Sequence, residues 1–175
     1  MATILEILKY ILPSLVVLIA ANSVVRKFLN AAERRQQLKV YEKSKDVTLR
    51  LRLQAYERLV LFLERINPRL IIPRVYDPSM TVLDLRTAIV MSINAEFEHN
   101  LSQQVYVSPN LWSSIRTAKE QELSMINHIS DTLNPEAPAR ELHIRILEVI
   151  AAANTDLPSE MAINVVNAEA RELLQ

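Results

Sequence analysis

The chain has 175 residues, and its twenty basic and twenty acidic residues cancel to a formal net charge of zero at pH 7. It contains no cysteine, which excludes disulfides, zinc–thiolate sites and cysteine nucleophiles. It also contains no glycine, which excludes P-loops, dinucleotide-binding fingerprints and type I′ hairpin turns. A glycine-free chain rich in leucine, alanine, glutamate, arginine and isoleucine favours an all-α fold, and no pattern in it calls for a cofactor.

An apolar run at residues 4–25 is the first predicted element. As a helix, its 22 residues would extend about 33 Å, enough to cross a bilayer core of about 30 Å. Pro13 is compatible with a span because neighbouring groups can satisfy the carbonyl that it frees. Tyr10 suits one membrane interface, and Arg26 with Lys27 closes the other. We therefore predict a transmembrane anchor over residues 1–25.

Two other interpretations of this run are a cleaved signal peptide and a core helix of a soluble bundle. Residues 10–21 have the length of a signal-peptide h-region, and Ala21, Asn22 and Ser23 loosely fit a cleavage site. However, the segment before the run is not clearly basic, and Arg26 and Lys27 directly after it disfavour export. The membrane span is the interpretation that we prefer.

Basic residues follow the apolar run. Residues 26–52 contain nine lysines and arginines against three acidic residues, and a single lysine lies within the first 25 residues. This bias predicts an N-terminus outside the cell and a C-terminal side in the cytoplasm. Residues 26–48 are predicted as a basic juxtamembrane helix and residues 49–175 as a cytoplasmic helical domain. The basic residues placed closest to the membrane are Arg26, Lys27, Arg34 and Arg35.

Charge is divided along the chain, with a sum of +6 over residues 26–65 and −6 over residues 66–175. Each lysine or arginine close to anionic headgroups contributes about 1 kcal/mol of attraction. An anionic-lipid surface-binding module is therefore one alternative function, although a solvated helix surface explains the charge equally well. Tyr41 is a possible stacking residue of the basic segment, but the membrane explains the charge more simply, and we predict no nucleic-acid partner.

The segment that follows has helical periodicity. No proline occurs between Pro13 and Pro68, so one helix could continue from the membrane to Ile66, or it could break near Ser44. Apolar residues recur at spacings of four and three, which predicts an amphipathic helix over residues 49–66 and makes self-association plausible. The recurring set is Leu49, Leu53, Tyr56, Val60 and Leu63, widened by Leu59, Phe62 and Ile66.

Prolines and caps predict the remaining boundaries. Asn67 and Pro68 end the helix, and residues 69–79 are predicted as a loop. Thr81 and Asp84 form a capping-box pattern that opens a helix to about residue 104, followed by a short extended link at residues 105–107. Later helices are predicted at 108–133 (opened by Ser108 and Pro109), 139–153 and 156–174 (opened by Asp156 and Pro158). The domain is thus a small bundle of four or five helices.

Two segments, RLQAYERLVLFLERI at residues 52–66 and EFEHNLSQQVYVS at residues 96–108, carry a resemblance to a known family. The chain resembles a family of small, uncharacterised, membrane-anchored α-helical proteins of the Bacteroidota along its whole length. The resemblance implies the anchored helical architecture and a bacterial source, so that the membrane would be the inner, cytoplasmic one. It implies no activity, ligand or partner.

Glu96 and His99 are spaced three residues apart, the geometry with which helices present carboxylate and imidazole ligands to two metal ions in di-iron bundles. Neither His128 nor His143 has a glutamate three residues before it, so a second pair would have to come from another copy. A metal-binding helical protein or enzyme that uses Glu96 and His99 is an alternative function. A hydrogen-bonded histidine near a helix end is the simpler interpretation.

Polar residues crowd the two segments of the resemblance. They could form an internal network between helices, which we favour, or a face that binds a partner. The interaction candidates are Arg52, Tyr56, Glu57, Glu64, Glu98, Asn100, Gln103 and Gln104. No serine has a plausible His–Asp arrangement in sequence. The leading prediction is a single-pass membrane-anchored scaffold, adaptor or accessory subunit, not an enzyme, which acts by contact with a protein partner or a second copy.

Overall fold

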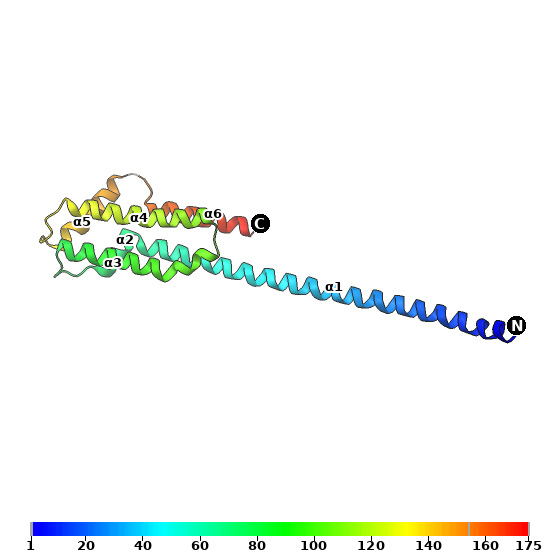
Figure 1. Cartoon of the computed structure of the whole chain (residues 1–175). Coiled ribbons are helices and arrows are strands. Elements are labelled where there is room, and N and C mark those ends of the chain that lie inside the picture. The colour runs from blue at the N-terminus through cyan, green and yellow to red at the C-terminus, as the bar shows by residue number, and fades with distance from the viewer. Residues whose placement is uncertain (1, 154, 175) are drawn as a thin grey trace. The chain divides into compact units, whose positions relative to one another are not determined.

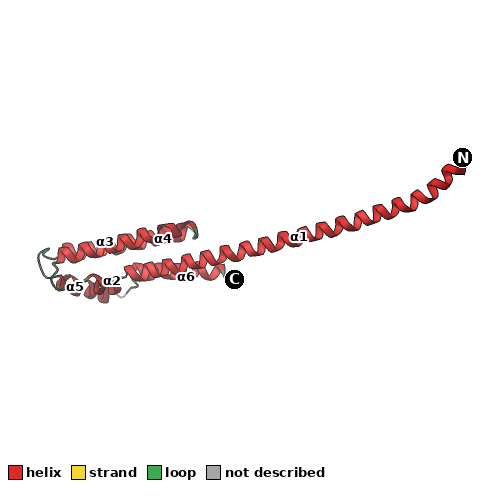
Figure 2. Cartoon of the chain, turned by 90° about the horizontal axis from the view of Figure 1, so that it is seen from below, coloured by secondary structure: helices red, strands yellow, loops and turns green. Residues whose placement is uncertain are grey.

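The computed structural model describes the backbone of residues 2–153 and 155–174, and the side chains of residues 15, 17, 18, 21–30, 32–153 and 155–174. All regular secondary structure in this part of the chain is helical, which confirms the predicted all-α class (Figures 1 and 2). The elements are α1 (Ala2–Ile66), α2 (Pro68–Val75), α3 (Val82–Asn100), the 3₁₀ helix η1 (Leu101–Val105), α4 (Pro109–Asp131), α5 (Ala139–Ala152) and α6 (Pro158–Leu173).

The chain divides into an N-terminal unit, Met1–Thr48, and a compact unit, Leu49–Gln175, called the body below. Helix α1 is continuous, so the break considered near Ser44 is not present. All described side chains of residues 15–48 are exposed. Among the described residues, no helix combines the length and the apolar character needed to cross a membrane. The side chains at residues 2–14, 16, 19 and 20, which include Tyr10 and most of the predicted span, lie outside the described residues.

The core of the body forms around the C-terminal part of α1. Its buried stripe holds Leu59, Phe62, Leu63 and Ile66, each at most 1 % exposed, because residues three and four apart share one helix face. The predicted seam is thus partly displaced: Tyr56 and Leu63 are buried, whereas Leu49, Leu53 and Val60 are half-buried at its edge. Buried side chains of the other helices complete the core, among them Ile71, Ile89, Ile115, Ile146 and Val166.

The predicted loop at residues 69–79 is wrong in its first half, where α2 forms. The Asn67 side chain accepts a hydrogen bond from the Arg69 backbone N–H at 3.0 Å, and Pro68 occupies the first helical position. Ile71 and Ile72 are completely buried, so their packing offsets the hydrogen bond that Pro73 removes from the short helix. With α2 and the end of α1, the described part of the body has six α-helices, where four or five were predicted.

The extended link predicted at residues 105–107 is also wrong at its start. Helix α3 ends at Asn100, and the chain continues as η1 to Val105, after which Tyr106 keeps a helical backbone conformation. The Asn100 side chain donates a hydrogen bond to the Glu96 carbonyl at 2.8 Å, so it occupies an acceptor of the last turn. Gln103 and Gln104 therefore lie on a 3₁₀ turn and not on α3.

The predicted caps of α3 and α4 are confirmed. Thr81 and Asp84 form a reciprocal capping box, with the Asp84 backbone N–H donating to the Thr81 hydroxyl at 3.2 Å. Ser108 caps α4 by accepting a hydrogen bond from Leu111 N–H at 3.1 Å. Helix α6 differs from the prediction, because Leu157 and not Asp156 occupies its N-cap position, with its N–H bound by a carboxylate of the first turn.

Candidate protein-binding groove

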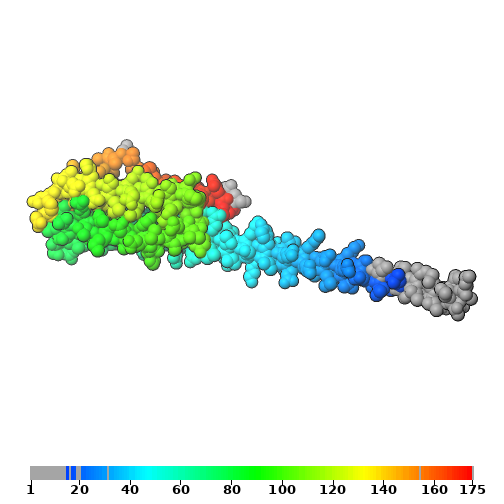
Figure 3. Space-filling view, in the orientation of Figure 1, coloured from blue at the N-terminus to red at the C-terminus, as the bar shows by residue number. Residues whose placement is uncertain are grey.

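Helices α4 and α6 pack against each other along most of the length of α6. Figure 3 shows another face of the body, which the side chains of α3 and α4 cover. Two glutamates fix the pair. Glu169 near the end of α6 binds Ser108 at the start of α4, and Glu122 of α4 binds Ser159 at the start of α6. The two helices are therefore antiparallel, and each presents a carboxylate to the N-terminus of the other, where the helix dipole favours negative charge.

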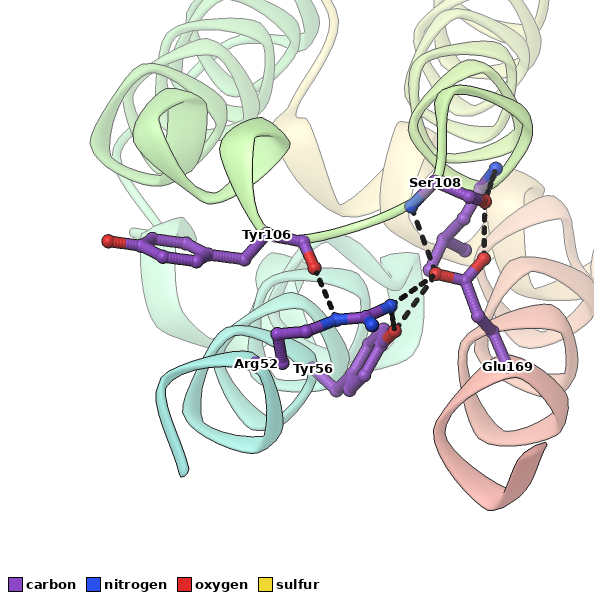
Figure 4. A network of polar contacts seen from close by, with 6 residues as sticks. Arg52, Tyr56, Tyr106, Ser108 and Glu169 are labelled. Carbon is purple, nitrogen blue, oxygen red and sulfur yellow. Dashed lines mark hydrogen bonds and ion pairs between the residues drawn. The ribbon is translucent and has the colours of Figure 1, made fainter. Parts of the chain in front are cut away.

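Glu169 is the centre of a polar network that joins three elements (Figure 4). Its carboxylate accepts hydrogen bonds from the Ser108 N–H at 2.9 Å, the Ser108 hydroxyl and the Tyr56 hydroxyl at 2.9 Å. Arg52 Nη2 lies 4.0 Å from the same carboxylate and donates to the Tyr56 oxygen at 3.0 Å, and Arg52 Nε donates to the Tyr106 carbonyl at 3.1 Å. The network ties α1 and α6 to the segment between η1 and α4.

The environment shifts the two titratable groups at the centre of this network in opposite directions. Burial alone would raise the pKa of Glu169, but hydrogen bonds from Ser108 and Tyr56 and the charge of Arg52 outweigh it, so the pKa is lowered. The pKa of Tyr56 is raised, first by burial and then by its hydrogen bond to Glu169. Glu169 is therefore held as a carboxylate and Tyr56 as a neutral donor.

Glu122 fixes the other end of the helix pair in a drier environment. Its side chain is completely buried, and Oε1 accepts hydrogen bonds from the Ser159 N–H at 3.1 Å and the Ser159 hydroxyl at 2.7 Å. Oε2 is buried without a hydrogen-bond partner among the described residues. Burial raises the pKa of Glu122 in spite of the two hydrogen bonds, and the nearby Glu160 raises it further. The folded body thus favours the protonated form of this carboxyl more than water does.

A groove of about 470 Å³ lies between α4 and α6, with the two glutamates fixing the helices at its ends. Helix α4 lines it with small side chains, and α6 contributes Met161 and Val165, which are 49 % and 42 % exposed. Two apolar side chains left in water beside a wall of small residues form a surface that can take side chains from another helix. The small residues are Ser113, Ser114, Thr117 and Ala118.

The predicted interaction residues lie elsewhere on the body, and none of them lines this groove. Arg52 and Tyr56 belong to the Glu169 network, so the structure uses both side chains internally. Asn100 and Gln103 are buried, and their side-chain amides bind neighbouring groups of the chain. The remaining candidates, Glu57, Glu64, Glu98 and Gln104, are exposed. Their role in binding stays a prediction.

Glu96 and His99 line a separate small cavity between α1 and α3. Arg65 Nη1 donates to both carboxylate oxygens of Glu96, at 3.1 and 3.2 Å, so this carboxylate already has a cationic partner. The described residues contain no group of three histidine, aspartate or glutamate side chains placed to hold a metal ion. The geometry of the described residues therefore gives the metal-binding alternative no support.

The sequence interpretation missed Glu122, Glu169, Met161 and Val165. Glu122 carries a signal that could have identified it, because it interrupts the buried stripe of α4. That stripe consists of Ile115, Ala118, Glu122, Ile126 and Ile129, with spacings of three and four. A carboxyl in the middle of an apolar stripe must be buried with a partner. Nothing local identifies Glu169, whose partners are 61 and 113 residues away in sequence.

The described part of the body is all-helical, and its groove between α4 and α6 exposes Met161 and Val165 beside small side chains. The chain belongs to the Family of unknown function (DUF7935), whose model matches residues 2–173. No curated protein and no solved structure matches the chain. The family model thus covers nearly the whole chain, and it assigns no function to it.

Proposed function

We propose that this protein is a membrane-anchored helical adaptor of the bacterial inner membrane, whose body binds an apolar helix of a partner protein in the groove between α4 and α6. The observation that carries the proposal is the exposure of Met161 and Val165 beside the small side chains of α4. The adaptor acts by contact and needs no cofactor. Its N-terminus lies outside the cell and its body in the cytoplasm.

The lining of the groove defines the kind of partner. None of its side chains is charged, so a charged side chain from the partner would lose water without gaining an ionic contact. The α4 wall extends from Asn110 to Gln121, which is about 16 Å of helix, or roughly three turns. An amphipathic helix that places apolar residues at spacings of three and four matches this length and chemistry.

The glutamates at the two ends of the helix pair support binding without reorganisation. Glu122 and Glu169 fix both ends of α6 against α4 through hydrogen bonds to Ser159 and Ser108. A groove whose walls are already fixed loses little conformational entropy when a ligand enters it. This rigidity favours a partner that folds or docks onto a fixed surface.

Partner binding can be tested by site-specific crosslinking, because the chain has no native cysteine. We expect Thr117→Cys, coupled to a photoactivatable thiol reagent in membranes of the native cells, to yield one discrete crosslinked protein. Thr87→Cys, also on an exposed helical position but outside the groove, is the matched control. Equal yields of the crosslinked protein from both variants, or no crosslinked protein from Thr117→Cys, would show that the groove is not the contact surface. A product of twice the chain's mass would identify the partner as a second copy.

Two features support the anchor. The sequence of residues 4–25 has the length and apolar character of a span, and the basic residues Arg26, Lys27, Arg34 and Arg35 follow it. The described side chains of residues 15–48 are all exposed, including Phe28 at 75 %, so the unit buries none of them against itself. Most helices in proteins gain their stability from packing of their apolar side chains, so a membrane or a partner that covers these side chains would stabilise this helix. The basic part also suits contact with anionic headgroups.

Orientation in the membrane can be measured with a pair of single cysteines. Thr3→Cys is expected to react with a membrane-impermeant thiol reagent in intact spheroplasts, whereas Ser44→Cys is expected to react only after lysis. The expectation follows from the excess of basic residues after the span. Labelling of Ser44→Cys in intact spheroplasts would show that the orientation is the reverse of the proposed one. Recovery of the chain in the soluble fraction would contradict the proposed membrane anchor.

A further inference from the structure

A second site lies away from the groove, in a cavity of about 210 Å³ between the C-terminal parts of α1 and α3. Its lining combines cationic and apolar side chains. Arg58 and Arg65 are seven residues apart on α1, nearly two turns, so both side chains lie on the same helix face. His99 of α3 also lines the cavity. Concave sites with an apolar wall and a few convergent polar groups are the usual form of small-ligand sites.

The hydrogen-bonding capacity of the two arginines is largely unused. Arg65 engages Glu96 through one nitrogen, Nη1, so Nε and Nη2 form no hydrogen bond with any described residue. Arg58 is exposed and takes part in no hydrogen bond or ion pair between described residues. A guanidinium presents a planar set of N–H donors that can form bidentate hydrogen bonds with a carboxylate. The cavity therefore offers a free anion-binding group at Arg58.

The wall beside Arg58 is apolar. Leu61 is 52 % exposed, whereas Phe62, which also lines the cavity, is 1 % exposed and packs its ring against Phe97 with the ring centroids 5.8 Å apart. A ligand that has only a charged group would leave the exposed part of Leu61 in water, whereas one with a branched or aromatic group would cover it. The cavity volume limits such a ligand to a small molecule or a single side chain.

Glu96 determines the charge of the ligand. Its carboxylate is 19 % exposed and lines the same cavity, so the two arginines and this glutamate sum to +1. A monoanion neutralises that charge, while a phosphate dianion would meet the carboxylate at close range. We infer that the cavity between α1 and α3 binds a small monocarboxylate that carries an apolar group, with Arg58 on the carboxylate and Leu61 on the apolar group. This site is independent of the proposed partner-binding groove.

The single tryptophan of the chain reports on this cavity. Trp112 stacks on Phe97 with ring centroids 5.6 Å apart, and Phe97 contacts Phe62 of the cavity wall. Titration of the full-length protein in detergent with isovalerate, a branched monocarboxylate, is expected to change Trp112 fluorescence saturably in the millimolar range. Arg58→Ala is expected to weaken binding about tenfold or more, because a charge-assisted hydrogen bond is lost. Arg140→Ala, an exposed arginine of α5 outside the cavity, should leave binding unchanged.

Two further probes test the class of ligand. Isovaleramide has the same shape without the charge and is expected to bind at least tenfold more weakly, and inorganic phosphate is expected to bind more weakly than isovalerate. No saturable change up to about 10 mM isovalerate would overturn the site, since the free energy of binding would then be negligible. Equal binding of the amide, tighter binding of phosphate, or an unchanged affinity in Arg58→Ala would overturn the assigned chemistry.

Discussion

Replacement of Glu122 by glutamine is expected to stabilise the body at neutral pH. The side chain is completely buried, one of its oxygens has no partner among the described residues, and burial raises its pKa. At neutral pH the wild-type chain therefore carries the cost of either a buried charge or a proton held above the ordinary pKa. Glutamine keeps an oxygen acceptor for Ser159 without that cost. We expect a rise in the melting temperature of a few degrees.

The pH dependence of this effect has a defined sign. Because the pKa of Glu122 is higher in the folded than in the unfolded state, the folded state binds more protons between the two values. The contribution of Glu122 to stability is therefore fully present below its ordinary pKa of about 4.5 and is lost as the pH rises through the folded value. Glu122→Gln should remove this loss, so the difference between the two proteins grows from pH 4.5 upward.

Urea unfolding of the full-length chain in detergent, followed by Trp112 fluorescence at pH 4.5 and pH 8, measures this difference. Glu120→Gln is the matched control, because Glu120 lies two residues earlier on α4 with its side chain 68 % exposed. It should leave the stability nearly unchanged at both pH values. If Glu122→Gln lowered the stability equally at both, the carboxyl would be an ordinary hydrogen-bond acceptor without a raised pKa.

Replacement of Glu169 by alanine is expected to destabilise the body by about 2–4 kcal/mol. The carboxylate accepts three hydrogen bonds, two from Ser108 and one from Tyr56, and all three donors would lose a partner at once. Arg52, which lies 4.0 Å from the carboxylate, would lose its counter-charge. Glu172→Ala is the control, since Glu172 is exposed and lies less than one turn further along α6.

The pH dependence of Glu169 has the opposite sign from that of Glu122. The pKa of Glu169 is lowered in the folded state, so its contribution is present above the ordinary value of about 4.5 and is lost as the pH falls through the folded value. Glu169→Ala should therefore lose less stability on acidification than the wild type. Urea unfolding of both proteins at pH 7 and pH 3.5 measures this difference in the loss of stability. A variant that stayed within 0.5 kcal/mol of the wild type, about the effect of a neutral surface substitution, would show that the network contributes nothing to stability.

Local chemistry explains which parts of the fold were predictable. The caps formed by Thr81 and Ser108 depend on residues within three positions, and both predictions are confirmed. Helix α2 was missed because Pro73 argues locally against a helix, while the burial of Ile71 and Ile72 that outweighs it is tertiary. The groove could not be predicted from the sequence, because it forms only when residues of α4 and α6, some fifty positions apart, lie side by side. Sequence periodicity gives the faces of helices and not their partners.

The contact between Tyr56 and Glu169 also bears on the order in which the chain is made. The two residues are separated by 113 positions, so Tyr56 leaves the ribosome long before α6 exists. Since chains are synthesised from the N-terminus at about 5–20 residues per second, the α1 stripe and the start of α4 wait several seconds for their last neighbour. During that interval Leu59, Leu63 and their neighbours lack part of their final cover. The helix synthesised last thus completes the core around the helix synthesised first.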